Sequence, residues 1–257
     1  MAQESTHVNN AFYDDLGPLW QSGSSHPVAL LRAENRVRNP WILETVQKTF
    51  RTCDFLDVGC GGGLLTNYLA EQGLGKWVTS VEGIDLSASS LDQAKQTDRT
   101  GKVIYREANA LCLPHRDAHF HAVSAMDILE HVEYPLDLIR EAARVLQPGG
   151  LFFFHTFNRN FFSWLTAIKI LEWRVRNTPK NLHIYRLFIR PAELRLLLTA
   201  CDLEVVEMRG LKPVLLQRPL WKMLATGEVD PGFRFSFTRS LLTGYCGYAR
   251  KRPSHSS

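Results

Sequence analysis

Two segments of the chain contain the residue types that hold a nucleoside cofactor. The first is the apolar stretch Phe55–Val58, which runs into a turn containing Gly59, Gly61 and Gly63. Glycine lets the backbone approach a ligand closely because it has no Cβ and accepts positive φ, and a following helix offers unpaired N–H groups. The second is Asp85, 26 positions beyond Gly59, whose carboxylate can accept hydrogen bonds from two ribose hydroxyls. Together they predict a nucleoside-cofactor site.

The residues around this turn favour S-adenosylmethionine over NAD. A dinucleotide site needs a third glycine at the position that Leu64 occupies here. Asp57 would repel a pyrophosphate but attract a cationic amino-acid group. Asn109 could hydrogen-bond the adenine edge, or be an ordinary turn residue, and Met126 could contact the ligand or belong to the core. These residues are the further candidates for cofactor binding.

A second polar set, Asp127, Glu130 and His131, follows a predicted strand. If a helix begins at Asp127, the three side chains share one face and converge. Two carboxylates and an imidazole could hold a divalent ion such as Mg²⁺, or position and deprotonate a hydroxyl. We therefore take Glu130 and His131 as candidate catalytic residues and all three as candidate metal ligands. Alternatively, the acids merely complement a helix dipole and His131 is a buried, hydrogen-bonded residue.

Strand-like and helix-like segments alternate along the chain, which predicts an α/β fold: a mostly parallel sheet with helices on both faces. Helices are expected over 64–71, after the N-cap Ser87, over 136–146 and from Pro191. The expected strands are 55–58, 78–84, 103–106, 120–125, 151–154, 204–208 and 245–250. Because ligands gather at the carboxyl ends of parallel strands, the candidate residues should meet at one edge of the sheet.

Length and composition are consistent with a single domain over residues 1–257. Residues 1–50 carry a helical pattern with aromatics and are expected to lie over the cofactor as a lid.

The five cysteines are scattered, which indicates reduced thiols in a cytoplasmic protein and argues against a disulfide framework or a zinc site. No secretory signal and no apolar run of about 18 residues occurs, so we expect no membrane-spanning segment.

Residues 158–190 are both basic and aromatic. Seven basic side chains there are opposed by Glu172 alone, whereas the whole chain carries a net charge of only +4. One apolar stripe at helical spacing is expected to comprise Phe161, Trp164, Leu165, Ile168, Leu171 and Val175. Such a segment can lie in the interface of an anionic membrane, although a buried helix with a solvated basic edge would show the same pattern. We expect no nucleic-acid partner, since no module that binds nucleic acid accompanies the charges.

These motifs resemble those of the ubiquinone-biosynthesis O-methyltransferase family over roughly residues 30–212. Most class I methyltransferases share some of them, but the block between Asn158 and Leu194 is more specific to the family. The quoted matches are D-V-G-C-G-G-G, G-I-D-L-S, L-E-H-V, L-Q-P-G-G, Asn158-Arg-Asn160, Ser163-Trp164, Pro179-Lys180, His183 and Phe188-Ile-x-Pro-Ala-Glu-Leu194.

The resemblance implies a seven-stranded Rossmann-like sheet whose last strand is antiparallel. It also implies methyl transfer to a phenolic hydroxyl of a polyprenylated phenol or quinol, by an enzyme peripheral to the inner membrane face. A quinone-biosynthesis complex is a further partner that the resemblance suggests. Family contacts with the cofactor fall on Arg38, Gly59, Asp85 and Met126. The family's metal positions fall on Asp127, Glu130 and His131.

The resemblance is incomplete in two places, and both leave the acceptor open. Leu19-Trp20-Gln21 stands where the family usually has Trp-Trp-Asp, and the region after Leu211 is unlike the family's ending. Two alternative functions therefore stay in view: a class I methyltransferase acting on another, soluble small molecule, and a non-catalytic scaffold subunit of a membrane-associated complex. The number of methylation steps, the prenyl length and the oligomeric state are not predicted.

Overall fold

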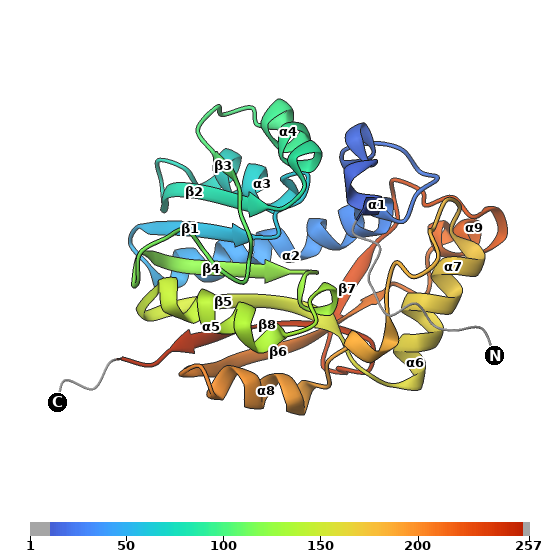
Figure 1. Cartoon of the computed structure of the whole chain (residues 1–257). Coiled ribbons are helices and arrows are strands. Elements are labelled where there is room, and N and C mark those ends of the chain that lie inside the picture. Colours follow the sequence, from blue (N-terminus) through green and yellow to red (C-terminus); the bar gives the residue numbers. More distant parts are fainter. Residues whose placement is uncertain (1–10, 254–257) are drawn as a thin grey trace.

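One mixed eight-stranded sheet organises the residues that the computed structural model describes, 11–253 (Figure 1). The strand order is β3-β2-β1-β4-β5-β8-β6-β7. The strand bounds are β1 Cys53–Val58, β2 Val78–Asp85, β3 Ile104–Glu107, β4 Phe120–Met126, β5 Leu146–Phe157, β6 Leu203–Pro213, β7 Phe235–Thr238 and β8 Gly244–Lys251.

The predicted fold class is confirmed, with one strand more than expected. Strands β1 to β5 pair in parallel, and the last strand, β8, lies antiparallel between β5 and β6, as predicted. The additional strand is β7, which pairs antiparallel with the edge of β6. Its four residues lie between the two last predicted strands, 204–208 and 245–250, where no strand was expected.

Helices cover both faces of the sheet and crowd its carboxyl edge (Figure 1). The helix bounds are α1 Ala11–Asp14, η1 Gly17–Trp20, α2 Val28–Thr49, α3 Leu64–Gly73, α4 Ala88–Thr97, η2 Leu129–His131, α5 Pro135–Val145, α6 Phe161–Ser163, η3 Trp164–Ile170, α7 Leu171–Arg174, η4 Tyr185–Leu187, α8 Pro191–Thr199 and α9 Arg218–Thr226. In Figure 1, α1, α7 and α9 lie on the side toward which the arrows of β1 and β4 point.

Neighbouring strand residues supply the two faces of the core. Phe55 packs in a cluster with α2 and α3, whereas Leu56 packs in a cluster with α5 and α8. The same alternation places Phe153 on the first face and Phe152 on the second. Successive side chains of a strand point to opposite faces, so an almost unbroken apolar run is what a strand covered on both sides requires.

Local signals set most element ends. The Ser87 side chain accepts a hydrogen bond from the Ser90 N–H and caps α4 as predicted, and Pro191 opens α8. The predicted bounds of β5, 151–154, were too narrow: α5 ends at Val145, and β5 already begins at Leu146 and runs to Phe157. The pairing of β4 with β5 shifts register there, which accommodates the Pro-Gly-Gly residues.

The first 50 residues divide into parts with different packing. Residues 1–10 lie outside the described residues. Helix α1 and turn η1 form a small apolar cluster with the start of α2, in which Leu16 and Trp20 are buried. Helix α2 instead packs on the sheet through Trp41, Ile42, Leu43 and Val46. Of the described residues up to 50, the stretch 11–20 is therefore positioned as a cover, whereas α2 belongs to the body of the domain.

The segment 158–190 forms short helices in place of the single stripe that was predicted. Ile168 and Val175 are buried, but Phe161 is 61% exposed, because α6, η3 and α7 differ in helical pitch. Phe162 and Trp173 are exposed beside it. Within residues 11–253, no helix combines the length and the apolar content that crossing a membrane requires.

Candidate active site

The glycine turn after β1 forms one wall of the site. The Gly59 and Cys60 N–H groups donate to the Ile84 carbonyl, which ties the turn to the end of β2. Gly59 and Gly61 both adopt positive φ. A Cβ at Gly59 would lie 2.6 Å from Ile128, and one at Gly61 would lie 2.5 Å from the Trp20 ring. The turn therefore needs glycine at both positions for conformation and for space.

Asp85 stands at the end of β2 and faces this turn. Its Oδ2 accepts a hydrogen bond of 2.8 Å from the Gly61 N–H, and its Oδ1 accepts one of 2.9 Å from the Ser87 N–H. Burial raises the pKa of Asp85, and these two N–H donors oppose that rise. The carboxylate is thereby held rigidly at the edge of the pocket, where the sequence predicted a partner for ribose.

Asp57 lies deeper, at the end of β1, and is only 3% exposed. The Ser124 hydroxyl donates to its Oδ1 at 2.6 Å. Burial, helped by the nearby carboxylates Asp85 and Asp127, raises the pKa of Asp57 to about 7. A carboxyl group with such a pKa ionises readily when a cation lies beside it. The predicted contact between Asp57 and the cationic amino-acid group of the cofactor requires this property.

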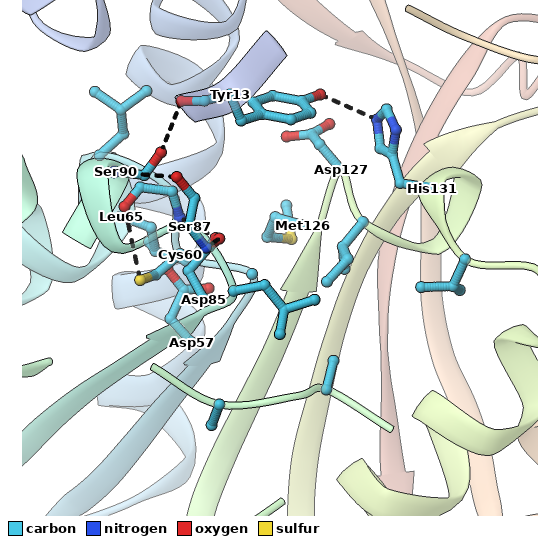
Figure 2. A pocket seen from close by; sticks show the side chains of 18 of the residues that line it. Tyr13, Asp57, Cys60, Leu65, Asp85, Ser87, Ser90, Met126, Asp127 and His131 are labelled. Atoms are coloured by element: carbon cyan, nitrogen blue, oxygen red, sulfur yellow. Dashed lines mark hydrogen bonds between the residues drawn. The ribbon is translucent and has the colours of Figure 1, made fainter. Parts of the chain in front are cut away.

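A cavity of about 670 Å³ opens in front of these residues, within the range of ligand pockets. Asp57 and Asp85 lie on one side of it, Asp127 and His131 on the other, and Met126 between them (Figure 2). Asn109 also lines the cavity, and its Oδ1 accepts a hydrogen bond from the Leu111 N–H, which makes it a turn residue as well as a lining residue. The cavity thus brings together all the predicted cofactor-binding residues except Arg38.

Residues 13–20 lie over this cavity. Trp20 packs on Gly61 and Gly62, and its indole N–H donates to the Ser90 hydroxyl at 3.2 Å. Asp14 accepts hydrogen bonds from Ser87 and Ser89, at its carboxylate and its carbonyl oxygen respectively. These contacts bind the cover to the start of α4, beside Asp85.

Arg38 and Asp127 form an ion pair at the wall of the cavity, in which Arg38 is fully buried and Asp127 is partly buried. The Arg38 guanidinium is fully buried and donates to both carboxylate oxygens of Asp127, at 2.8 and 2.6 Å. His155 contacts the same carboxylate, and Glu34 lies 3.5 Å from Arg38. Burial opposes ionisation of Asp127, but the Arg38 charge and His155 hold its pKa well below its usual range.

The structure does not bring Asp127, Glu130 and His131 into one ligand set. No α-helix begins at Asp127, which adopts a positive φ, and η2 follows it as a single 3₁₀ turn. Among the described residues, the potential ligand atoms of Glu130 and His131 cluster with His183, within 4.8 Å of one another, whereas those of Asp127 cluster with Glu34 and His155. The predicted all-three set does not fit a magnesium ion here, because the Asp127 carboxylate is already bound to Arg38.

Three side chains of the site escaped sequence analysis. Tyr13 extends over the cavity, and its hydroxyl lies 3.2 Å from His131 Nε2 (Figure 2). His155 lies next to Asp127 in the interior of β5, and His183 comes from the loop before η4. Only His183 had a signal, since it belongs to a quoted family motif, but nothing in its spacing links it to His131.

Comparison with known proteins identifies the group to which the chain is similar. A family model described as a methyltransferase domain matches residues 56–154. The ubiquinone biosynthesis O-methyltransferase of Paraburkholderia phytofirmans is 35% identical over 202 residues, covering 77% of this chain and 84% of the relative. That of Burkholderia multivorans is 38% identical over 194 residues, covering 74% and 79%. The chain belongs to the ubiquinone biosynthesis O-methyltransferase family.

Solved structures agree with this family at the level of the fold. Magnesium protoporphyrin IX methyltransferase from Synechocystis, solved with bound SAH, superposes with a TM-score of 0.63 at 14% identity over 95% of both chains. A methyltransferase from Bacillus halodurans gives 0.58 at 18% identity, over 82% of this chain and 98% of its own. As a member of the ubiquinone biosynthesis O-methyltransferase family, the protein is an S-adenosylmethionine-dependent O-methyltransferase, and the predicted cofactor is confirmed.

Proposed function

We propose that this enzyme transfers the methyl group of S-adenosylmethionine to a phenolic hydroxyl on a polyprenylated ring in ubiquinone biosynthesis. The relatives named for this pathway support the proposal. The observation that carries it is the arrangement of one cavity, with Asp57 and Asp85 on one side and His131 on the other. Asp57 and Asp85 would hold the cofactor, Met126 lies between the two sides, and His131 would face the acceptor.

The Tyr13 contact supports a phenolic acceptor. In the structure the chain's own phenol meets His131 Nε2 at 3.2 Å, so a phenolic hydroxyl can approach this imidazole. We propose that the acceptor's hydroxyl takes this position when the Tyr13 ring moves aside. Direct displacement at the methyl carbon then depends on alignment with the methyl–sulfur axis, which a walled cavity supplies.

Glu130 and His131 are proposed to remove the phenolic proton. A free phenol has a pKa of about 10 and is mostly neutral at pH 7. Burial lowers the pKa of His131 to about 3, so its imidazole stays neutral and can accept a hydrogen bond from the phenol. Burial and the Asp127 carboxylate raise the pKa of Glu130 to about 7, near the value that suits general base catalysis. Glu130 is the stronger base of the two and would take the proton, while the neutral His131 would accept a hydrogen bond from the phenol at Nε2.

The function is tested by incubating the purified enzyme with S-adenosylmethionine and short-chain polyprenyl catechols, and analysing the product by mass spectrometry. We expect one added methyl group on the ring oxygen. A soluble catechol without the prenyl chain, methylated equally fast, would favour a small soluble acceptor instead. Cofactor binding without transfer to any of these acceptors would favour the scaffold alternative.

We propose further that segment 158–190 binds an anionic membrane surface. Phe161, Phe162 and Trp173 are exposed there, next to the exposed basic side chain of Arg174. Exposed aromatic and basic side chains on one segment are typical of an interfacial helix. Four of the seven basic residues contribute less than the sequence suggested, because each has an acidic partner: Lys169 pairs with Glu172, Arg176 with Glu228, Arg159 with Glu193 and Arg186 with Glu133.

Helix α9 extends this apolar surface. It contacts α7 and lies beside it in Figure 1. Leu216 is 93% exposed, and Leu215 and Trp221 are exposed with it. A membrane would cover all of these side chains at once, at the edge of the sheet where the acceptor site opens. Association with other enzymes of quinone biosynthesis stays a prediction.

The chain offers a matched pair of variants for the membrane proposal. Trp173→Ser with Arg174→Glu removes an exposed tryptophan and its basic neighbour from α7. Lys76→Glu with Trp77→Ser makes the same changes just before β2, at the amino edge of the sheet. We expect only the first variant to lose flotation with phosphatidylglycerol vesicles. Equal loss in both variants, or no loss in the first, would contradict the assignment of this surface.

A further inference from the structure

The cover over the cavity is fastened to the start of α4 by three serine hydroxyls, those of Ser87, Ser89 and Ser90. The first two donate to Asp14, and the third donates to the Tyr13 carbonyl at 3.1 Å (Figure 2). Ser87 is also the residue whose N–H group holds Asp85. The cover is therefore attached directly beside the carboxylate that was predicted to bind the ribose.

Gln21, which follows the cover, fastens it to the cofactor turn as well. Its Nε2 donates to the Gly62 carbonyl at 3.0 Å and to the Thr97 hydroxyl at 3.2 Å. The neighbouring Trp20 ring lies against Gly61 and Gly62, so it covers the turn against which the cofactor binds. Gln21 stands where the family usually has an aspartate, and an ionised carboxylate cannot donate to a carbonyl. The bond to the turn therefore depends on the amide of this chain.

The attachments of the chain change at Gly23, which adopts a φ of +89°. Beyond it, the Ser24 carbonyl accepts a hydrogen bond from the Val229 N–H at 2.8 Å, and the Ser25 carbonyl accepts one from the Asn177 side chain at 2.7 Å. The residues before Gly23 are thus held by α4 and the cofactor turn, and those after it by two distant loops. A glycine between two separately held segments can act as a hinge.

The cover has few buried side chains of its own. Of residues 12–20, Leu16 and Trp20 are buried, and they pack in a small cluster with Val28. Arg32 of α2 adds a hydrogen bond to the Leu19 carbonyl, at the surface. Segments with few buried apolar contacts open locally at a low cost in free energy. The hydrogen bonds to α4 and to the cofactor turn therefore account for much of what keeps the cover in place.

We propose that the cover, residues 11–20, is a lid that turns about Gly23, and that Gln21 and the α4 serines form a latch which must open whenever the cofactor enters or leaves. Each bond of the latch joins two groups of the protein, so it forms with or without the cofactor and slows entry and exit alike. Gln21 lies outside the residues that line the cavity. It is a positioning residue that acts through the Gly62 carbonyl.

The test measures the exchange of S-adenosylhomocysteine, the demethylated cofactor, by stopped-flow fluorescence, since Trp20 in the cavity wall reports its arrival. Gln21→Glu keeps the size of the side chain but cannot donate to Gly62. We expect the association and dissociation rate constants both to rise about tenfold, because two hydrogen bonds of the latch are lost, while Kd changes less than about twofold. Gln96→Glu, the same change at an exposed position of α4, should alter neither rate constant.

Two results in Gln21→Glu would overturn the proposal. Faster release with unchanged entry would show that this side chain holds the cofactor itself. Unchanged rate constants would show that the cofactor passes through another opening, the exposed rim of the cavity formed by Leu86, Leu111 and Tyr134.

A second pair of variants tests the hinge. Gly23→Ala should also raise both rate constants, because the latched position holds residue 23 at a positive φ that strains an alanine. Gly101→Ala is the matched control, since Gly101 has a φ of +63° and open space around an added Cβ. Equal acceleration in both variants, or none in Gly23→Ala, would remove Gly23 as the hinge. Thermal unfolding shows that each variant is folded, and no methyl transfer is measured, so the result is independent of the acceptor's identity.

Discussion

The two ends of the cavity are built in different ways. The cofactor end uses the turn after β1 and the ends of β2 and β3, all within residues 57–111, and its geometry is mainly that of the backbone. The acceptor end combines Tyr13, the stretch 126–134 and, behind it, His183. A backbone turn has a signature in adjacent residues, whereas a group of side chains from distant loops has none.

The carboxylates at the two ends of the cavity, Asp85 and Glu130, also differ in their hydrogen-bond partners. Asp85 accepts hydrogen bonds from two backbone N–H groups within the structure itself. Glu130 is fully buried, and its side-chain hydrogen-bonding neighbour is the Thr156 hydroxyl. The cofactor end is thus held by backbone donors before ligand arrives, whereas the carboxylate at the acceptor end depends on side-chain contacts. Five changes test this contrast, in order of decreasing expected effect.

Arg38→Met should have the largest effect, because it leaves the Asp127 carboxylate buried without its partner. We expect the free energy of unfolding to fall by about 3–5 kcal/mol, as measured by urea denaturation. Arg36→Met, which removes hydrogen bonds to the Pro231 and Phe233 carbonyls only, should cost about 1 kcal/mol. If Arg38→Met instead keeps its stability and loses cofactor affinity, Arg38 belongs to the cofactor end, as the family resemblance implies.

Asp85→Ala should weaken binding of S-adenosylmethionine by roughly 3 kcal/mol, or about 150-fold, since charge-assisted hydrogen bonds to the ribose are lost and the turn loses its acceptor. Isothermal titration calorimetry measures the change. Glu107 is a suitable control, because it stands beside Asp85 at the end of β3 and is exposed. An equal loss in Glu107→Ala would show that general charge, and not the Asp85 geometry, holds the cofactor.

Glu130→Ala should lower kcat about a hundredfold while the affinity for S-adenosylmethionine stays almost unchanged, because Glu130 acts at the acceptor end. Single-turnover kinetics and calorimetry separate the two quantities. Asp137→Ala, at an exposed carboxylate on α5 that pairs with Arg140, serves as the control. Unchanged turnover in Glu130→Ala with bound cofactor would remove Glu130 from the mechanism.

Cofactor affinity should depend on pH through Asp57. Its pKa in the folded protein is raised to about 7, so below pH 7 the carboxyl holds a proton that must leave before it can bind a cationic amino group. We expect affinity to fall about tenfold for each pH unit below 7 and to level off above it. Asp57→Asn has no titrating group at this position, so its affinity should not change between roughly pH 5.5 and 7. A slope that persists in this variant would assign the titration to another group.

Tyr13→Phe should have the smallest effect, because it removes one hydrogen bond between the cover and His131. A single bond contributes about 1 kcal/mol, so we expect KM values to change about fivefold and thermal stability to change little. Tyr68→Phe, at a partly buried tyrosine that packs against the core, is the control. A change in kcat of more than about a hundredfold would give the Tyr13 hydroxyl a catalytic role of its own.

The same contrast between the two ends explains how much of the site could be predicted from the sequence. Gly59, Gly61 and Asp85 lie where expected, because a strand, a turn and a helix start fix them locally. Asp127 was grouped wrongly with Glu130 and His131, because the prediction assumed an α-helix where Asp127 adopts a positive φ and turns toward Arg38. Strand β7 was missed because four partly exposed residues carry too little pattern.

By itself, the sequence determined the alternation of strands and helices, the cofactor turn and the class of chemistry, since each depends on periodicity or on adjacent residues. Only the tertiary structure decided which side chains meet at the acceptor end. His183 lies beside His131, and Arg38 occupies the ion pair with Asp127, because the loops at the carboxyl edge and the N-terminal helix pack there. Contacts between segments so far apart depend on the packing of the whole domain, which no local spacing encodes.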